Sequence, residues 1–225
     1  WGLGYDALAR ANPGLVMVRL SGFGQTGPYK DRPGFGAIGE SMGGMRYITG
    51  YPDRAPVRVG ISIGDSLAAM FGVIGALSAI HHRATSGRGQ VVDVALYEAV
   101  FAMMESMLPE YGMGENVRER TGSALPGIVP SNTYKCGDGR YVVIGANADS
   151  IFKRMMNAIG RADLAGDPAL ADNAAVQLGH AARFPRSPWH RLPASEHARW
   201  PTSSAQGRAT LGQHVLARRG VPELR

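Results

Sequence analysis

The chain has 225 residues, which is enough for one large domain, or one and a half ordinary domains, with a sizeable buried core. Its single cysteine, Cys136, excludes an internal disulfide and favours a reducing, cytoplasmic setting. No uninterrupted apolar run reaches the roughly 18 residues that indicate a membrane span. No Cys/His cluster predicts a metal site.

The net charge of +6 gives only weak support for a nucleic-acid partner, because it comes entirely from the end of the chain. Residues 1–173 contain 16 basic and 16 acidic side chains, so this part is neutral overall. Residues 174–225 contain 8 arginines and 2 glutamates. The basic balance is therefore a property of the tail alone.

The first predicted elements are a short helix over Tyr5–Ala11 and a strand over Leu15–Leu20, followed by a loop that extends to Pro33. The loop contains Gly22-Phe-Gly24-Gln-Thr-Gly27, which fits the dinucleotide-binding pattern G-x-G-x-x-G. That pattern requires a helix directly after the glycines, and Pro33 would fall inside such a helix. We therefore interpret the glycines as part of an irregular loop and not as a nucleotide fingerprint.

In the middle of the chain, the residue pattern predicts two helices with a loop and a strand between them. Helical spacing covers Ala37–Tyr47, although three glycines weaken it, and the loop "TGYPDRAPVR" follows. The segment "VRVGISIG" is interpreted as a strand that leads into a helix over Ser66–Arg83. Apolar residues almost encircle that helix, which is typical of a buried helix.

In the second half of the chain, the residue pattern predicts strands and helices in alternation. These are a strand at Val91–Leu96, a Met-rich core helix at Glu98–Leu108, a linker at Pro109–Pro130, a hairpin at Thr133–Ala146 with a Gly-Asp-Gly turn, and a helix at Asp149–Ile159 that ends at Gly160.

Asp65 is the strongest candidate for a catalytic residue. It lies where the predicted strand "VRVGISIG" meets the predicted helix. An aspartate at that point commonly caps the helix, and local sequence alone favours this structural role. The same carboxylate, flanked by Gly60 and Gly64, is also placed to attack an activated acyl group as a covalent nucleophile.

Two other patterns near Asp65 favour different chemistry but fit poorly. Gly60-Ile-Ser62-Ile-Gly64 matches the nucleophile elbow G-x-S-x-G of serine hydrolases. That reaction needs a histidine, and His81 and His82 lie at the far end of the helix beside Ser62. We interpret both histidines as residues of the helix terminus.

The segment from Ala174 onward differs in composition from the rest of the chain. It has no Lys, Asp, Asn, Ile, Tyr, Met or Cys, and it holds four of the six histidines and five prolines. Two explanations stay open: a shifted reading frame that begins near residues 173–176, or a disordered basic tail.

The motifs SGFGQTGP, RPGF, TGYPD, GISIGDS and TSGRGQVVDVALYEA, in this order, resemble the class III CoA-transferases of the CaiB/BaiF type, which include formyl-CoA transferase. The resemblance covers roughly residues 1–173. It implies transfer of coenzyme A from an acyl-CoA to a small mono- or dicarboxylic acid, through an aspartyl anhydride and an aspartyl-CoA thioester. It also implies that the nucleophile is Asp65, that a coenzyme A thioester is a substrate, and that no cofactor or metal is permanently bound.

Further site residues follow from the same resemblance. The coenzyme A contacts of the family fall on Arg32, Pro33, Gly34 and Phe35. The glycine-rich loop that closes over the aspartate falls on the region "TGSALPGIVP", where Gly127 is a weaker candidate because the region lacks a glycine run.

The resemblance implies an α/β fold: part of a Rossmann-like large domain, then the start of a small α+β domain, from an interlocked homodimer. The corresponding expected segments are the large domain with the catalytic aspartate, a linker, the start of the small domain and the atypical tail, at residues 1–108, 109–130, 131–173 and 174–225. Members of the family begin about a hundred residues earlier, so we expect this chain to be a fragment.

Three other functions remain as alternatives. An acyl-CoA racemase or epimerase of the same fold would need a histidine partner for Asp65, and the sequence offers none near the expected site. The chain could instead be an inactive, truncated remnant. A serine hydrolase ranks last.

Overall fold

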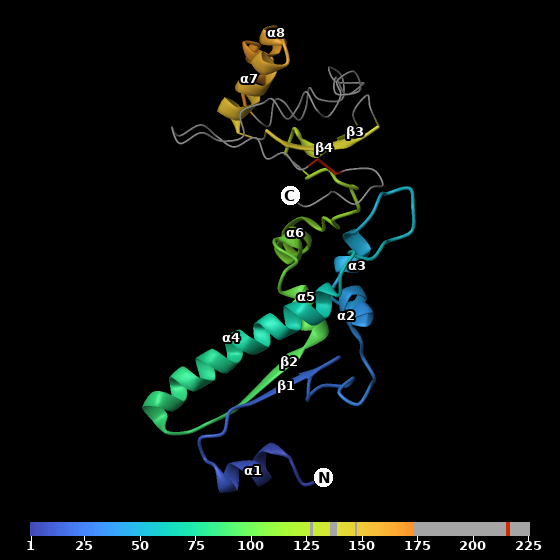
Figure 1. Cartoon of the computed structure of the whole chain (residues 1–225). Coiled ribbons are helices and arrows are strands. Elements are labelled where there is room, and N and C mark those ends of the chain that lie inside the picture. Colours follow the sequence, from blue (N-terminus) through green and yellow to red (C-terminus); the bar gives the residue numbers. More distant parts are fainter. Residues whose placement is uncertain (127, 136–138, 147, 173–214, 217–225) are drawn as a thin grey trace, which may run out of the picture. The chain divides into compact units, whose positions relative to one another are not determined.

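The computed structural model describes residues 1–126, 128–135, 139–146, 148–172 and 215–216 (Figure 1). The chain divides into two compact units, residues 1–122 and 123–225. Cys136, Gly127 and nearly all of the atypical tail lie outside the described residues.

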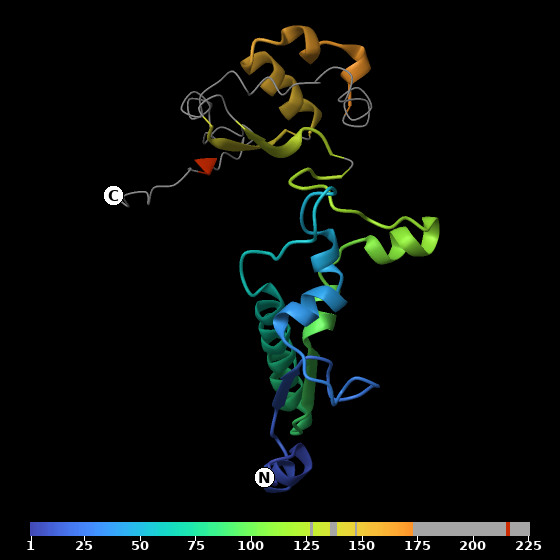
Figure 2. The same ribbon diagram turned by 90° about the vertical axis from the view of Figure 1, so that its right-hand side faces the viewer.

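The first unit is built on two parallel strands and a long helix that connects them. Strands β1 (Met17–Ser21) and β2 (Val91–Ala95) pair in parallel from Met17↔Val91 to Ser21↔Ala95. Parallel neighbours require a crossover connection, and helix α4 (Ile63–Ser86) forms the main part of it. Figure 2 shows α4 running alongside the two strands. The strands at residues 15–20 and 91–96 are thereby confirmed.

Small residues allow α4 to lie close to the strands. A Cβ at Gly72 would meet Val18 and Leu20 of β1 at 3.4–3.7 Å. A Cβ at Gly75 would overlap the side chain of Val92 on β2 at 2.4 Å. The glycines in the middle of α4, which lower its intrinsic helix propensity, are therefore explained by packing.

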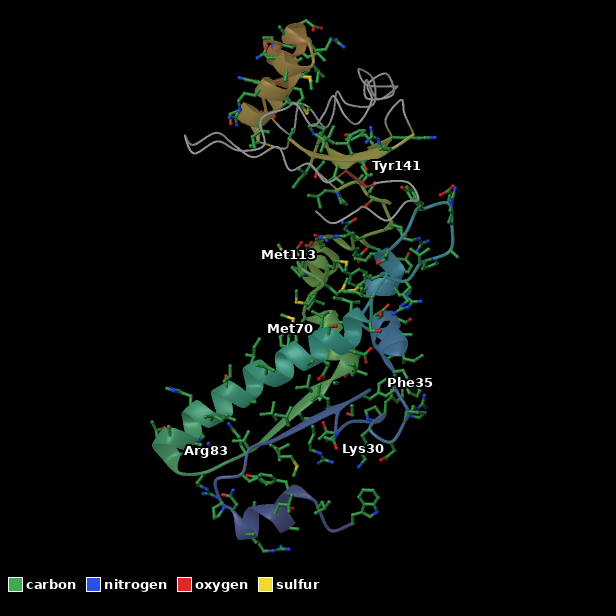
Figure 3. All side chains as sticks on the ribbon, in the orientation of Figure 1. Lys30, Phe35, Met70, Arg83, Met113 and Tyr141 are labelled. Atoms are coloured by element: carbon green, nitrogen blue, oxygen red, sulfur yellow. The ribbon has the colours of Figure 1, made fainter. Side chains whose placement is uncertain are left out.

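The opposite side of α4 is exposed, so the expectation of a helix buried all round is wrong for this chain. Its apolar side chains there are between 44 % and 63 % accessible. They are Met70, Val73, Ile74, Leu77 and Ile80, and we call them the α4 stripe. Figure 3 labels Met70 on this helix. By length and composition α4 could also cross a membrane, a possibility that the count of uninterrupted apolar residues missed, but core helices pass the same test.

The shorter helices of the first unit are α1, α2, α3, α5 and α6, at Tyr5–Ala11, Gly36–Met42, Met45–Ile48, Leu96–Phe101 and Met107–Gly114. The α1 prediction is confirmed. The helix expected over residues 37–47 is split at Gly43-Gly44, where Gly44 has φ = +93°. The Met-rich helix expected over residues 98–108 is likewise two helices. The second of these, α6, contains Pro109 and occupies part of the expected linker.

The strand predicted for "VRVGISIG" is wrong. Residues 57–62 form no ladder with a strand of the described chain, and α4 begins at Ile63. The β-branched residues of this segment favour an extended backbone. Without a neighbouring strand, however, the segment forms a loop.

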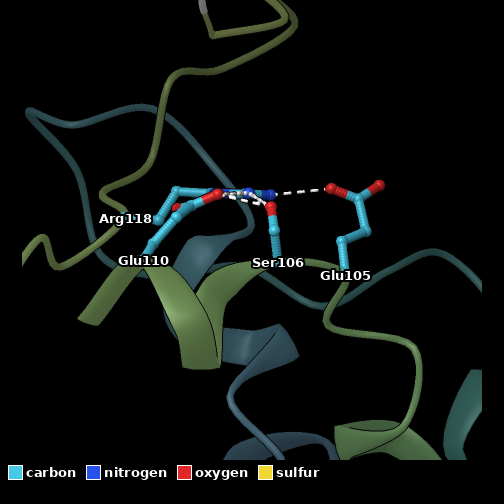
Figure 4. A network of polar contacts seen from close by, with 4 residues as sticks. All are labelled: Glu105, Ser106, Glu110 and Arg118. Carbon is cyan, nitrogen blue, oxygen red and sulfur yellow. Dashed lines mark hydrogen bonds and ion pairs between the residues drawn. The ribbon is translucent and has the colours of Figure 1, made fainter. Parts of the chain in front are cut away.

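Arg118 connects the α5–α6 turn to the segment that follows α6 (Figure 4). Its guanidinium donates to Glu105 Oε2 at 2.8 Å, to Ser106 Oγ at 3.0 Å, and to Glu110. Glu105 has φ = +52°, a conformation that non-glycine residues seldom adopt. We call this cluster the Arg118 network.

The second unit contains an antiparallel hairpin and helices. Strands β3 (Ser131–Lys135) and β4 (Tyr141–Gly145) confirm the predicted hairpin, although residues 136–138 of its turn lie outside the described chain. Strand β5 (Val215–Leu216) pairs with β4. Helix α7 (Asp149–Ala158) confirms the last predicted helix, and α8 (Ala162–Ala165) and a 3-10 turn (Pro168–Leu170) follow.

Each unit has its own core. In the first unit, α4, β2, α5 and the turn after it supply Leu67, Ala68, Val94, Leu96, Ala99, Val100 and Met104. In the second unit, β4, α7 and the following turns supply Val142, Ile144, Ala146, Phe152, Met155, Met156, Leu164 and Leu170.

Candidate functional site

Asp65 is the third residue of α4, and its side chain is exposed. The capping position belongs to Ser62, so the expectation that Asp65 caps the helix is wrong. The first turn of a helix carries unpaired backbone N–H groups and a partial positive charge, which interact favourably with a carboxylate. An accessible carboxylate at this place is suited to receive an electrophile from solvent.

Helix α2 begins directly against Asp65. A Cβ built on Gly36, the first residue of α2, would lie 2.3 Å from Asp65 Oδ2 and 3.0 Å from its Cγ. A Cβ on Gly64 would lie 3.0 Å from the carbonyl oxygen of Gly36. The first turns of α2 and α4 therefore meet through two residues that have no side chain, and the Asp65 carboxylate lies at that contact.

A buried carboxylate lies on the same helix, one turn after Gly36, and pairs with an arginine of α3. Glu40 is 2 % exposed, and Arg46 donates to its Oε2 at 2.9 Å. The Cγ of Glu40 lies 3.6 Å from the position of a Cβ on Gly64. A buried carboxylate is tolerated only when it is paired, so Arg46 is required for Glu40 to be in this place.

The glycine loop between β1 and α2 is held by contacts between its own residues and β2. A Cβ on Gly22 would overlap the Cα of Gly34 at 2.5 Å, because the two ends of the loop cross backbone to backbone. Asp93 of β2 accepts from the backbone N–H of Gln25 at 2.8 Å. The first glycine of the G-x-G-x-x-G pattern thus serves this crossing, and the pattern leads into a loop with no helix directly after it, as expected.

The four residues expected to contact coenzyme A end this loop. Phe35 is the capping residue of α2, next in the chain to Gly36, and its ring is 73 % exposed. Figure 3 labels Phe35 near Lys30 of the same loop. The Arg32 guanidinium lies over the ring of Tyr29, 4.1 Å from its centroid. Of the four, Phe35 is the neighbour in sequence of Gly36, which meets Asp65, whereas Arg32 contacts Tyr29.

An apolar cavity of about 240 Å³ opens beside the glycine loop. It is lined by Phe23, Thr26, Gly27, Pro28, Tyr29, Met42 and Tyr97. The Phe23 ring meets the Tyr29 ring edge to face, with centroids 5.5 Å apart. Burial raises the pKa of Tyr97, and its hydroxyl donates to Glu98 at 3.1 Å, so this phenol is neutral at physiological pH.

The alternative nucleophile, Ser62, has no histidine nearby along its helix. Its Oγ accepts from Arg58 at 3.2 Å. His81 is 19 residues further along, which corresponds to about 28 Å of α-helix. Ser62 therefore has the Arg58 guanidinium as its neighbour, and a cation cannot act as the general base that a serine hydrolase needs.

Sequence reasoning missed Gly36, Glu40, Arg46 and Arg58 as neighbours of the site. In the sequence, Gly36 only weakens a predicted helix and gives no sign of a close contact. Glu40 and Arg46 are not three or four residues apart, so helical spacing does not pair them. Gly127 lies outside the described residues, and within them no group of three or more potential metal ligands occurs.

A sequence model of CoA-transferase family III matches residues 1–192 of the chain. The chain is 60 % identical over 175 residues to the succinyl-CoA–D-citramalate CoA-transferase of Chloroflexus aurantiacus, which covers 78 % of this chain and 44 % of that protein. It is 44 % identical over 183 residues to the beta subunit of the succinyl-CoA–L-malate CoA-transferase of the same organism, covering 80 % of this chain and 45 % of the relative.

A solved structure of the same family also matches the fold of this chain. A CaiB/BaiF family protein from Brucella suis matches with a TM-score of 0.72 and 31 % sequence identity, over 88 % of this chain and 52 % of that one. The chain therefore has a mixed α/β fold of the CaiB/BaiF type. It spans about half the length of the proteins that it matches.

Proposed function

Because the chain belongs to CoA-transferase family III, we propose that the protein transfers coenzyme A from an acyl-CoA to a small carboxylic acid, with Asp65 as the nucleophile. The observation that carries this proposal is the exposed Asp65 carboxylate in the first turn of α4, against the bare backbone of Gly36.

The reaction is a series of acyl exchanges at Asp65. A carboxylate oxygen of Asp65 attacks the thioester carbonyl, the C–S bond breaks, and a mixed anhydride and the coenzyme A thiolate form. The thiolate attacks the aspartyl carbonyl and releases the donor acid, which leaves an aspartyl-CoA thioester. The acceptor carboxylate attacks the same carbonyl and expels the thiolate. The thiolate then attacks the acceptor acyl group and releases Asp65 as a free carboxylate.

We further propose that Arg32, Pro33, Gly34, Phe35 and Gly127 contribute to coenzyme A binding. The exposed ring of Phe35 supports this, because it stands one residue before the glycine that touches Asp65. An exposed aromatic ring offers an apolar surface for the pantetheine arm or the base of a nucleotide.

The names of the relatives support a choice of substrates. Several are called succinyl-CoA transferases, with D-citramalate, L-malate or mesaconate as the second substrate. We propose succinyl-CoA as the donor and a four- or five-carbon dicarboxylate as the acceptor. Arg58, which lies beside Ser62 at the start of α4, supplies a cation close in sequence to the nucleophile.

The finer architecture belongs to the same proposal. We assign residues 1–108 to a Rossmann-like large domain, 109–130 to a linker and 131–173 to the start of a small domain. The whole enzyme would then be an interlocked homodimer in the cytoplasm. The parallel β1–α4–β2 unit supports the first assignment, and the exposed α4 stripe supports association.

The test is intact-mass analysis of the chain after incubation with succinyl-CoA. We expect an adduct in the wild type that hydroxylamine removes, no adduct in Asp65→Ala, and an unchanged adduct in Asp53→Ala, whose carboxylate lies in an exposed loop. An adduct of equal yield in Asp65→Ala would disprove the role of Asp65. A folded wild-type chain without any adduct would favour the inactive remnant.

A further inference from the structure

We propose that Gly36 is a positioning residue for Asp65: the absence of a side chain at this position fixes where the nucleophilic carboxylate lies. The inference rests on the proposed function, since it assigns Gly36 a role in the reaction of Asp65. It concerns a residue of α2 that carries no chemical group of its own.

The position that a Cβ on Gly36 would occupy is close to all three atoms of the Asp65 carboxyl group. A Cβ on Gly36 would lie 2.3 Å from Oδ2, 3.0 Å from Cγ and 3.2 Å from Oδ1 of Asp65. Real Cβ atoms essentially never come within 3.0 Å of a heavy atom outside their own residue and its two chain neighbours. The observed position of the carboxylate is therefore available only while residue 36 is glycine.

A retreat of helix α2 from such a clash would lose packing, because Gly39 and the C-cap Gly43 press against α5. A Cβ on Gly39 would lie 2.9 Å from Leu96 Cβ, and a Cβ on Gly43 would lie 2.6 Å from Val100 Cγ1. Between these two positions, Glu40 is buried and paired with Arg46. These buried positions share one face of α2, so a movement of the helix away from α4 would also separate it from α5.

The Asp65 side chain is the part that can move. It is exposed, and a rotation about its side-chain bonds takes the carboxylate away from α2 at little cost. A methyl group at position 36 is therefore expected to leave the fold intact and to displace the nucleophile. Displacement of a reacting group by about 1 Å lowers a rate on the order of 100-fold.

The experiment compares Gly36→Ala with Gly112→Ala in the full chain. Gly112 is a helical glycine of α6, a Cβ added to it would meet no heavy atom within 4 Å, and it has no left-handed φ, so it is a matched control. One readout is the rate of adduct formation at saturating succinyl-CoA, together with the concentration that gives half of that rate. The other is the rate at which a carbodiimide and glycine ethyl ester amidate Asp65, mapped by peptide mass spectrometry. Circular dichroism monitors folding.

For Gly36→Ala we expect a native circular dichroism spectrum and adduct formation slower on the order of 100-fold, with the half-saturating concentration nearly unchanged. Amidation should become severalfold faster at Asp65, whose carboxylate moves into solvent, and stay unchanged at Asp53. Gly112→Ala should resemble the wild type in every readout.

Wild-type rates of both adduct formation and amidation in a folded Gly36→Ala chain would overturn the inference. Loss of the native spectrum would also overturn it, because Gly36 would then be needed for the fold and not for the position of one side chain. If Asp65→Ala still forms the adduct, the proposed function fails, and the amidation rates alone decide whether Gly36 sets the position of the carboxylate.

Discussion

Two kinds of glycine occur around the site, and they differ in which atoms they touch. Gly36 faces the mobile end of a side chain, whereas Gly22 faces the backbone of Gly34 at 2.5 Å. A side chain can rotate away from a methyl group, but two crossing backbones have to separate. Substitution at the first kind should therefore affect reactivity, and substitution at the second should affect folding.

We expect Gly22→Ala to destabilise the first unit by about 1–3 kcal/mol, because the added methyl group overpacks a backbone crossing. Gly112→Ala in α6 is the control. A Cβ there meets nothing within 4 Å, and alanine favours the helix by about 0.5–1 kcal/mol. Urea denaturation of the two variants measures both effects. Equal midpoints for Gly22→Ala and the wild type would show that the loop ends do not need this close approach.

At the scale of elements, the Arg118 network fixes the α5–α6 turn. Its bonds to Arg118 and Ser106 lower the pKa of Glu110 below the ordinary carboxyl value of 4.5. The folded state therefore binds the Glu110 proton more weakly than the unfolded state does. The stabilisation is complete above pH 4.5 and is lost as the pH falls through the lowered pKa of the folded state.

We accordingly expect Glu110→Gln to lower the melting temperature at about pH 7, with a difference from the wild type that shrinks as the pH falls below about 4.5. The measurement is a series of thermal melts across this range. Asp53→Asn, in an exposed loop, should show only a small difference at every pH. A Glu110→Gln difference that grows towards acid pH would contradict the sign of the pKa shift.

The elements differ in how far the sequence predicts them. Helix α1, strands β1 and β2, the β3–β4 hairpin and helix α7 follow local patterns, and the sequence predicts them closely. Residues 57–62 do not, because a β-branched run becomes a strand only where a neighbouring strand is available. The break of the α2–α3 region at Gly44 depends on a left-handed backbone that the helical spacing of its apolar residues hides.

The candidate site also has one part that the sequence predicts and another part that depends on contacts in space. Asp65 could be singled out because a carboxylate near a helix start has a recognisable local pattern. The contact with Gly36 could not, because it joins two residues that are 29 positions apart in sequence and one of them has no side chain. The buried Glu40–Arg46 pair likewise becomes visible only when α2 and α3 are placed in space.

At the scale of the whole molecule, the α4 stripe is the feature that requires an explanation. Its first four residues, Met70, Val73, Ile74 and Leu77, follow the i, i+3, i+4, i+7 spacing by which a helix packs against another element. No charged residue occurs between Ser66 and Ile80. An uncharged apolar patch is complementary to itself, which is the requirement for a two-fold contact between identical chains.

We therefore expect the chain to self-associate through the α4 stripe. The double variant Met70→Lys, Leu77→Lys should shift the chain to the monomer in sedimentation experiments, because it places buried charges at the contact. Ala55→Lys, in an exposed loop, should leave the association unchanged. A wild-type chain that stays monomeric at high concentration, or a double variant that associates as before, would contradict this prediction.

The most direct test of the central claim is to locate the acyl-enzyme in the sequence. The chain is incubated with succinyl-CoA, treated with hydroxylamine and digested, and the peptide that contains Asp65 is fragmented in a mass spectrometer. We predict that Asp65 carries a hydroxamate in place of its carboxylic acid, since hydroxylamine cleaves either the aspartyl anhydride or the aspartyl-CoA thioester. A hydroxamate on a different residue, with the Asp65 peptide unmodified, would contradict the account.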